Sequence, residues 1–153
     1  MKQVLIALGL TAIFAAPVAE MAMAQADPAQ VVRERRDGLR QVGDHMEAMA
    51  AIARSGGDPR PAAERVAAIQ AFFQGFPDRF PEGTARGTAG LDTRALPDIW
   101  TNRAEFERVN AALTPRLADL RAAAEGGDPR AFGAALQATG GACGACHRPF
   151  RAR

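Results

Sequence analysis

The sequence is poor in lysine, histidine and cysteine. Lys2 is the single lysine and there are two histidines and two cysteines, so nearly every cationic side chain is an arginine. A docking face built from a ring of lysines is therefore excluded. The 19 basic and 17 acidic residues leave a formal net charge of +2. So mild a balance does not suggest a nucleic-acid partner.

Tyrosine is absent, aromatic residues make up 6% of the chain, and runs of β-branched residues are few. Strands favour exactly those residue types, whereas alanine, which is abundant here, favours helices. The composition therefore predicts an all-α fold.

The N-terminus has the pattern of a secretory signal peptide. Lys2 precedes a short apolar run over residues 4–16 that is too short to span a membrane. Small residues around Ala24 match the cleavage pattern, which predicts a mature chain from Gln25, although cleavage after Ala26 would also fit. No membrane attachment is expected after cleavage.

Residues 1–24 are therefore excluded from the fold, and residues 25–153 have the length of one domain with one core. No second domain is needed.

The two cysteines and one histidine fall in a single motif near the C-terminus, Cys143-Gly144-Ala145-Cys146-His147. The pattern C-x-x-C-H is typical of covalent attachment of a c-type haem. Both thiols would add to the vinyl groups of the porphyrin, and the imidazole would bind the iron. At about 100° per residue, the three side chains share roughly a third of a helix circumference. One helix face would thus carry both attachment points and the axial ligand.

Three other interpretations of the motif are weaker. A zinc site needs four ligands, and only His45 remains to complete the set. A thioredoxin-like redox pair would follow a strand, and no strand pattern precedes Cys143. A structural disulfide would close too short a loop to stabilise much and would leave His147 without a role. Export together with C-x-x-C-H instead predicts one covalently attached haem c in a periplasmic protein.

Four helical segments are predicted from apolar periodicity and capping residues. Three of them open with Asp-Pro, an N-cap followed by proline at the first helical position. A kink or break is expected in the third, near residues 111–115, because Pro115 removes a backbone hydrogen bond. In the fourth segment, we expect the regular backbone hydrogen bonding to loosen at Pro149. The segments span residues 27–57, 58–75, 98–127 (with Thr101 as the alternative start) and 128–149.

The long connection over residues 76–96, rich in glycine and proline, is expected to be a crossover along one flank. Short first and third connections with a longer middle one predict an antiparallel four-helix bundle with the cofactor in its core. The glycines of the fourth segment suit a macrocycle close to the backbone, and for Gly133 and Gly140 close helix packing is an equal alternative. The four are Gly133, Gly140, Gly141 and Gly144.

These features resemble the cytochrome c′ family. The resemblance covers the whole mature chain: the arginine-rich first helix, the Pro97-Asp98-Ile99-Trp100 entry to the third, and the C-terminal motif through Arg151. The C-terminal position of C-x-x-C-H, the reverse of mitochondrial-type cytochromes c, indicates this family.

The resemblance implies what occupies the sixth position of the iron. In cytochromes c′ it is crowded by an apolar side chain of the first helix, whereas low-spin relatives place methionine there. The matching residue here is Leu39, which cannot bind iron. We therefore expect a five-coordinate, high-spin haem with His147 as its protein ligand. Met46, seven residues on, is interpreted as core filler but could overturn that expectation.

Other site residues also follow from the resemblance. Arg35 matches the arginine that contacts the haem, and Arg36 and Arg94 are further candidates for its propionates. Phe150 and Arg151 lie one turn beyond His147, and Arg151 matches the basic residue beside the proximal histidine. His45 is expected at the surface or an interface, and Trp100 in the core.

Two functions remain open. The first is a haem protein that binds diatomic gases such as nitric oxide and carbon monoxide and sequesters nitric oxide. The second is a low-spin electron carrier of a periplasmic redox chain, with a redox partner protein. Enzymatic turnover is not expected, because no general base or substrate cleft is recognisable. The family also implies a homodimer.

Overall fold

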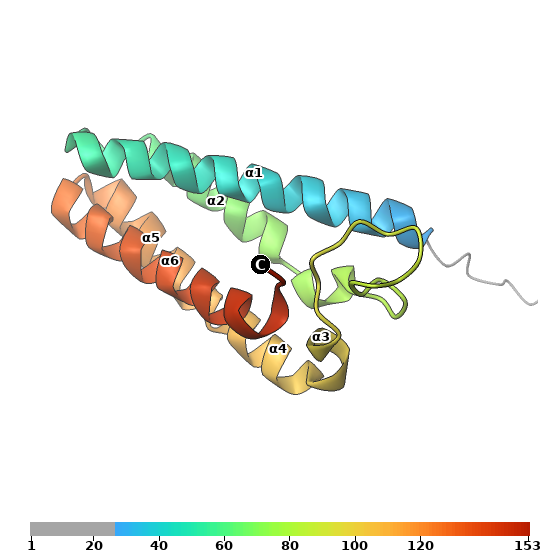
Figure 1. Cartoon of the computed structure of the whole chain (residues 1–153). Coiled ribbons are helices and arrows are strands. Elements are labelled where there is room, and N and C mark those ends of the chain that lie inside the picture. The colour runs from blue at the N-terminus through green and yellow to red at the C-terminus, as the bar shows by residue number, and fades with distance from the viewer. Residues whose placement is uncertain (1–26) are drawn as a thin grey trace, which may run out of the picture.

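The computed structural model describes residues 27–153, so the predicted signal peptide and both of its cleavage positions lie outside the described residues. The chain forms four antiparallel helical rods (Figure 1). α1 packs on α2, α2 on α5, α5 on α6, and α6 again on α1. The predicted all-α, four-helix bundle is confirmed.

α1 runs from Pro28 to Ser55. The side chain of Asp27 accepts a hydrogen bond from the backbone N–H of Ala29 at 3.0 Å, and so caps the first turn as predicted. At the other end Gly56 adopts a φ of 65°, a left-handed conformation that ends the helix.

α2 runs from Ala62 to Phe73 and starts later than Asp58-Pro59 predicted. The Asp58 carboxylate accepts a hydrogen bond from the Arg60 backbone N–H, but Pro61 has no N–H to donate. The intervening residues form only a tight turn, closed by the Ala62 N–H on the Pro59 carbonyl oxygen at 2.8 Å.

The third rod is divided more than the sequence predicted. It consists of α3 (Asp98–Thr101), α4 (Arg103–Ala111) and α5 (Leu113–Gly126). The break at Ala112 lies within the predicted interval, before Pro115. A second break, at Asn102, was not predicted; Asn102 has φ −126° and ψ 51°, outside the helical region.

α6 runs from Pro129 to Phe150, capped at its start by the Asp128 side chain. The helix continues through Pro149, so the loosening expected there is limited to its last residues. After Phe150 the tail pairs with the crossover: Ala95 and Arg151 form an isolated antiparallel bridge, and the Ala152 N–H donates to the Arg94 carbonyl oxygen at 2.9 Å.

The crossover connects α2 to α3 and contains the 3₁₀ turn η1 (Phe76–Arg79). It crosses the end of the bundle where α6 also terminates (Figure 1). Trp100, expected in the core, is only half-buried, and its indole N–H donates to the Phe80 carbonyl oxygen at 3.0 Å. That bond fixes the crossover to the third rod.

The core is divided into two clusters. One is mainly aliphatic and fills the middle of the bundle, around Met49, Val66, Leu117 and Phe132. The other is aromatic, lies at the crossover end, and consists of Phe76, Phe80, Ala95, Ile99, Phe106, Val109 and Phe150. Of the helices that the structure describes, none is both long and apolar enough to cross a membrane.

Candidate cofactor site

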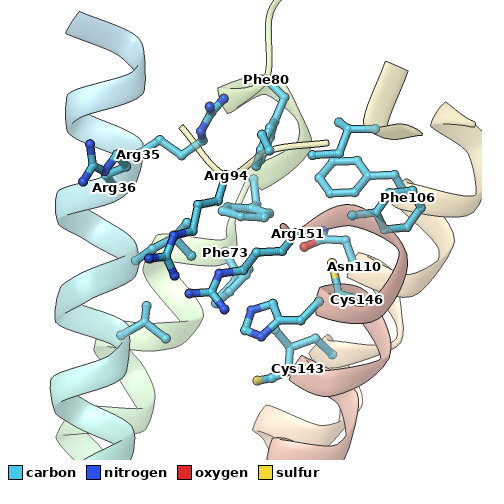
Figure 2. Close-up of a pocket in the computed structure, with 18 of the residues that line it drawn as sticks. Arg35, Arg36, Phe73, Phe80, Arg94, Phe106, Asn110, Cys143, Cys146 and Arg151 are labelled. Atoms are coloured by element: carbon cyan, nitrogen blue, oxygen red, sulfur yellow. The ribbon is translucent and has the colours of Figure 1, made fainter. Parts of the chain in front are cut away.

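A cavity of about 700 Å³ opens between α1 and α6 at the crossover end. Its volume is within the range of small-molecule and cofactor sites. Aromatic rings of Phe73, Phe76, Phe80 and Phe106 form much of its wall. The interior is thus apolar, whereas the lining also includes arginines from α1, the crossover and the C-terminal tail (Figure 2).

Both cysteines and His147 line this cavity from α6 (Figure 2). The two thiols are free of disulfide bonding, so the disulfide alternative is not supported. Among the described residues no group of three or more His, Cys, Asp and Glu side chains is placed to hold a metal ion, and His45 does not line the cavity. The zinc alternative therefore lacks its fourth ligand.

Partial desolvation shifts the pKa values of these groups, of which both cysteines are half-buried and His147 is exposed. Desolvation raises the pKa of Cys146 to about 11, and it also raises the pKa of Cys143. Desolvation, with the nearby positive charge of Arg151, lowers the pKa of His147. Near neutral pH the site therefore presents two neutral thiols and a neutral imidazole, which is the form of histidine that binds a metal.

The opposite wall of the cavity comes from α1. Leu39, Val42 and Met46 line it, and Met46, which was interpreted from the sequence as core filler, also packs against the aliphatic cluster. His147, Cys143, Cys146 and Met46 are the lining residues that carry a nitrogen or sulfur atom suited to iron. Leu39 offers only hydrocarbon.

Arg35 is 2% exposed and bound to the crossover. Its Nη1 and Nη2 atoms donate to four oxygens, and the guanidinium carbon lies 4.2 Å from the centroid of the Phe80 ring. The acceptors are the Arg79 carbonyl at 3.0 Å, the Thr84 hydroxyl and carbonyl at 3.2 Å each, and the Thr93 hydroxyl at 3.0 Å. Burial lowers the pKa of Arg35 to about 10.

The other predicted arginines also lie at the cavity. Arg36 is ion-paired with the Asp92 carboxylate and donates to the Asp92 carbonyl oxygen at 2.8 Å. Arg94 and Arg151 both reach into the cavity (Figure 2). Phe150 is 3% exposed and lines the cavity from the end of α6, where its ring centroid lies 5.3 Å from that of Phe106.

Several lining residues were not predicted. They include the four phenylalanines of the wall and Asn110, which is labelled near Cys146 in Figure 2. For Phe73, Phe76 and Phe80 the available signal was the clustering of aromatic residues over 72–80, where the second helical segment meets the long connection. Asn110 had none.

Of the four glycines in α6, only Gly140 lines this cavity. A Cβ atom built there would meet nothing within 4 Å, so its side of the cavity stays open. Gly141 borders a separate shallow groove, and Gly133 lines neither. At Gly133 and at Gly140, the two positions where close helix packing was the alternative, a Cβ atom would meet nothing within 4 Å, so close packing explains neither.

The residues present fit a haem. A flat apolar macrocycle with an anionic edge needs a cavity of this size with aromatic walls and cations at its mouth. Covalent attachment and axial ligation need two thiols and a neutral imidazole on one face, and α6 provides them.

Comparison with known proteins agrees with this chemistry. The family model described as Cytochrome C' matches residues 30–151. The chain belongs to the cytochrome c′ family. Like other cytochromes c′, it carries covalently attached haem c.

Two relatives illustrate the range of the family. The chain is 35% identical to cytochrome c′ of Rhodospirillum rubrum over 99% of both chains. It is also 36% identical to cytochrome c-556 of Agrobacterium tumefaciens, over 77% of this chain and 94% of that one.

Solved structures of a cytochrome c′ from Alcaligenes xylosoxidans share the fold. A nitric oxide complex of a single-residue variant is 26% identical, with a TM-score of 0.71, and covers 84% of this chain and 98% of that one. A carbon monoxide-bound variant is 25% identical, with a TM-score of 0.72 and the same coverage of both chains.

Proposed function

We propose that this cytochrome c′ binds diatomic gases, with nitric oxide as the ligand it sequesters, and that its iron is five-coordinate and high-spin. The observation that carries the proposal is the position of Leu39, which lines the same cavity as His147 but from α1. A leucine cannot bind iron, yet it occupies space that a gas molecule would need.

The proposed roles of the α6 residues follow from their chemistry. Cys143 and Cys146 would each hold the haem through a thioether to one of its vinyl groups, the thiol hydrogen passing to the neighbouring carbon. His147 binds the iron through its neutral imidazole. The bound haem supplies the ferrous iron to which a gas binds.

Leu39 would select the ligand. A small neutral gas can enter by displacing the side chain, whereas an anion or water gains no hydrogen bond from it. On the other face, Arg151 is one turn beyond His147 and close enough to lower the pKa of its imidazole. A cation in that place would also interact with a gas bound on the proximal side, as the family resemblance implies.

Binding without turnover is part of the proposal. The one carboxylate among the lining residues, Asp92, is ion-paired with Arg36. Location in the periplasm is proposed from the signal-peptide pattern. The homodimer stays a prediction, which sedimentation of the purified protein would test.

The deciding experiment is the spin state of the ferrous haem, read from its optical and magnetic spectra, followed by titration with carbon monoxide and nitric oxide. A high-spin spectrum that changes with each gas is expected. A low-spin spectrum that neither gas alters would reject gas binding.

An electron carrier is the second candidate, favoured by one observation. Met46 lines the cavity from the same wall as Leu39, and a thioether can bind haem iron. Met46→Leu separates the two functions, because it retains volume and removes the sulfur. If the spectra of the variant and the parent match, Met46 is not a ligand; a change from low to high spin would support the carrier.

A further inference from the structure

The charges around the cavity are unbalanced. Among residues 27–153, Asp92 is the only acidic residue in its lining, compared with five arginines. These are Arg35, Arg36, Arg40, Arg94 and Arg151.

Three of the five already have partners. The guanidinium of Arg35 is bound by neutral oxygens of the crossover. Arg36 is ion-paired with Asp92, and Arg40 with Asp37 at 3.0 Å. Arg94 and Arg151 remain, and within residues 27–153 neither side chain has a carboxylate within 4.0 Å or a hydrogen-bond acceptor.

The fold brings these two arginines to one place although they are far apart in the sequence. The Ala152 N–H donates to the Arg94 carbonyl oxygen at 2.9 Å, and the Leu96 N–H donates to the Phe150 carbonyl oxygen at 3.0 Å. Figure 2 shows both side chains reaching into the cavity, which His147 also lines. Two guanidinium groups at one mouth repel each other unless an anion lies between them.

The order of residues along α6 indicates which anion it is. Cys143 lies one turn before His147, and Arg151 lies one turn after it. If the cysteines hold a macrocycle through its vinyl half and His147 holds its iron, its other half would be free to meet Arg151, which also lines the cavity. The two propionates are on that half of a haem.

We propose that Arg94 and Arg151 together form the binding site for the haem propionates. This inference rests on the proposed attachment at Cys143, Cys146 and His147. Paired guanidiniums suit the site because each presents two parallel N–H donors to a carboxylate.

Arg35 then acts as a positioning residue. It holds the Thr93 hydroxyl at 3.0 Å, next to Arg94 in the chain, and so sets the crossover against α1. Its four bonds to the crossover leave it fewer donors for a carboxylate.

The test is the reduction potential of the haem-loaded protein as a function of pH, in the parent, in Arg94→Gln, in Arg151→Gln and in the double variant. Ionisation of a propionate stabilises the ferric iron, so the potential falls as pH rises through the propionate pKa. Loss of one guanidinium should move that step to higher pH by about one unit, and the double variant further. Both side chains are exposed, so the variants should fold.

Matched controls are available on the same two segments. Arg86→Gln on the crossover and Arg148→Gln on α6 remove exposed arginines that do not line the cavity, and should leave the step in place. Asp92→Asn removes the one other acid at the cavity. A step that disappears in Asp92→Asn would belong to Asp92 and overturn the proposal.

Two further results would also overturn it. One is a step that stays at the parent pH in both single variants and the double variant. The other is a potential that shifts on titration with inorganic phosphate in the parent but not in the double variant, because the site would then take a free anion. Mass spectrometry of the parent distinguishes failure of the propionate proposal from failure of the haem attachment on which it rests. A chain without covalently bound haem would refute the attachment itself.

Discussion

Arg35 and Thr84 are joined by two hydrogen bonds, both 3.2 Å long, from the guanidinium to the threonine hydroxyl and carbonyl oxygens. Both residues are buried, at 2% and 0% exposure. A helix of the bundle is thereby bound to the middle of the crossover, 49 residues away in the sequence. The crossover is therefore held in one conformation at the cavity mouth.

Replacing Arg35 should destabilise the protein through this connection. Arg35→Met retains length but removes the donor to two carbonyl oxygens and the Thr84 hydroxyl, whereas the Thr93 hydroxyl keeps the Ala95 N–H; the loss should cost about 3 kcal/mol of unfolding free energy. Urea unfolding of the haem-loaded protein measures this. Arg36→Met, which removes an exposed ion pair, should cost less than about 1 kcal/mol. Equal losses in both variants would contradict the role of Arg35.

Shortening Leu39 should speed gas binding. Leu39→Ala removes the hydrocarbon that a gas must displace, and about 1.4 kcal/mol off that barrier is a tenfold faster association. Flash photolysis of the carbon monoxide complex measures the rate. Leu91→Ala, on the crossover but outside the cavity lining, is the control and should leave it unchanged. An unchanged rate in Leu39→Ala would refute distal crowding.

Gly38 is required where α1 meets Phe72 of α2. A Cβ atom at position 38 would overlap the Phe72 ring, so Gly38→Ala should destabilise the protein by about 1–3 kcal/mol. Gly133→Ala provides the comparison, because a Cβ atom there meets nothing within 4 Å. It should stabilise α6 by about 0.5–1 kcal/mol. Thermal unfolding of the two variants should thus shift in opposite directions.

The thiols should be slow to react before haem is attached. Burial raises the pKa of Cys146 from 9.0 to about 11, so at pH 8 its thiolate fraction should be about a hundredfold below that of the unfolded chain. Because the folded chain retains a proton that the unfolded chain loses, its unfolding free energy should fall as pH rises from 9.0 toward about 11. Iodoacetamide labelling with and without urea tests the first point. Equal rates would mean that the site is not formed before attachment.

Much of the site could be predicted from local sequence. Cys143, Cys146 and His147 share a face because helix periodicity places them there. Asp27 and Asp128 cap helices through the residues that follow them. Assigning Leu39 to the distal position needed the family resemblance. Its place on the apolar face of α1 needed only the helical spacing of the apolar residues.

Contacts between distant segments could not be predicted in this way. Arg35 was expected to face the haem carboxylates, yet it is bound to oxygens that lie 44 to 58 residues away. Arg94 and Arg151 were assigned separate roles, and only the tail pairing brings them to one mouth. The aromatic wall likewise assembles from two separate parts of the chain, residues 73–80 and Phe106.

The sequence by itself determined the cofactor, its attachment face and the helical rods, because these depend on residues within one or two turns of each other. The tertiary structure decided which arginines remain free at the cavity and which one is bound to the crossover. A guanidinium can bind any oxygen that packing brings near, and packing is not encoded in a local repeat.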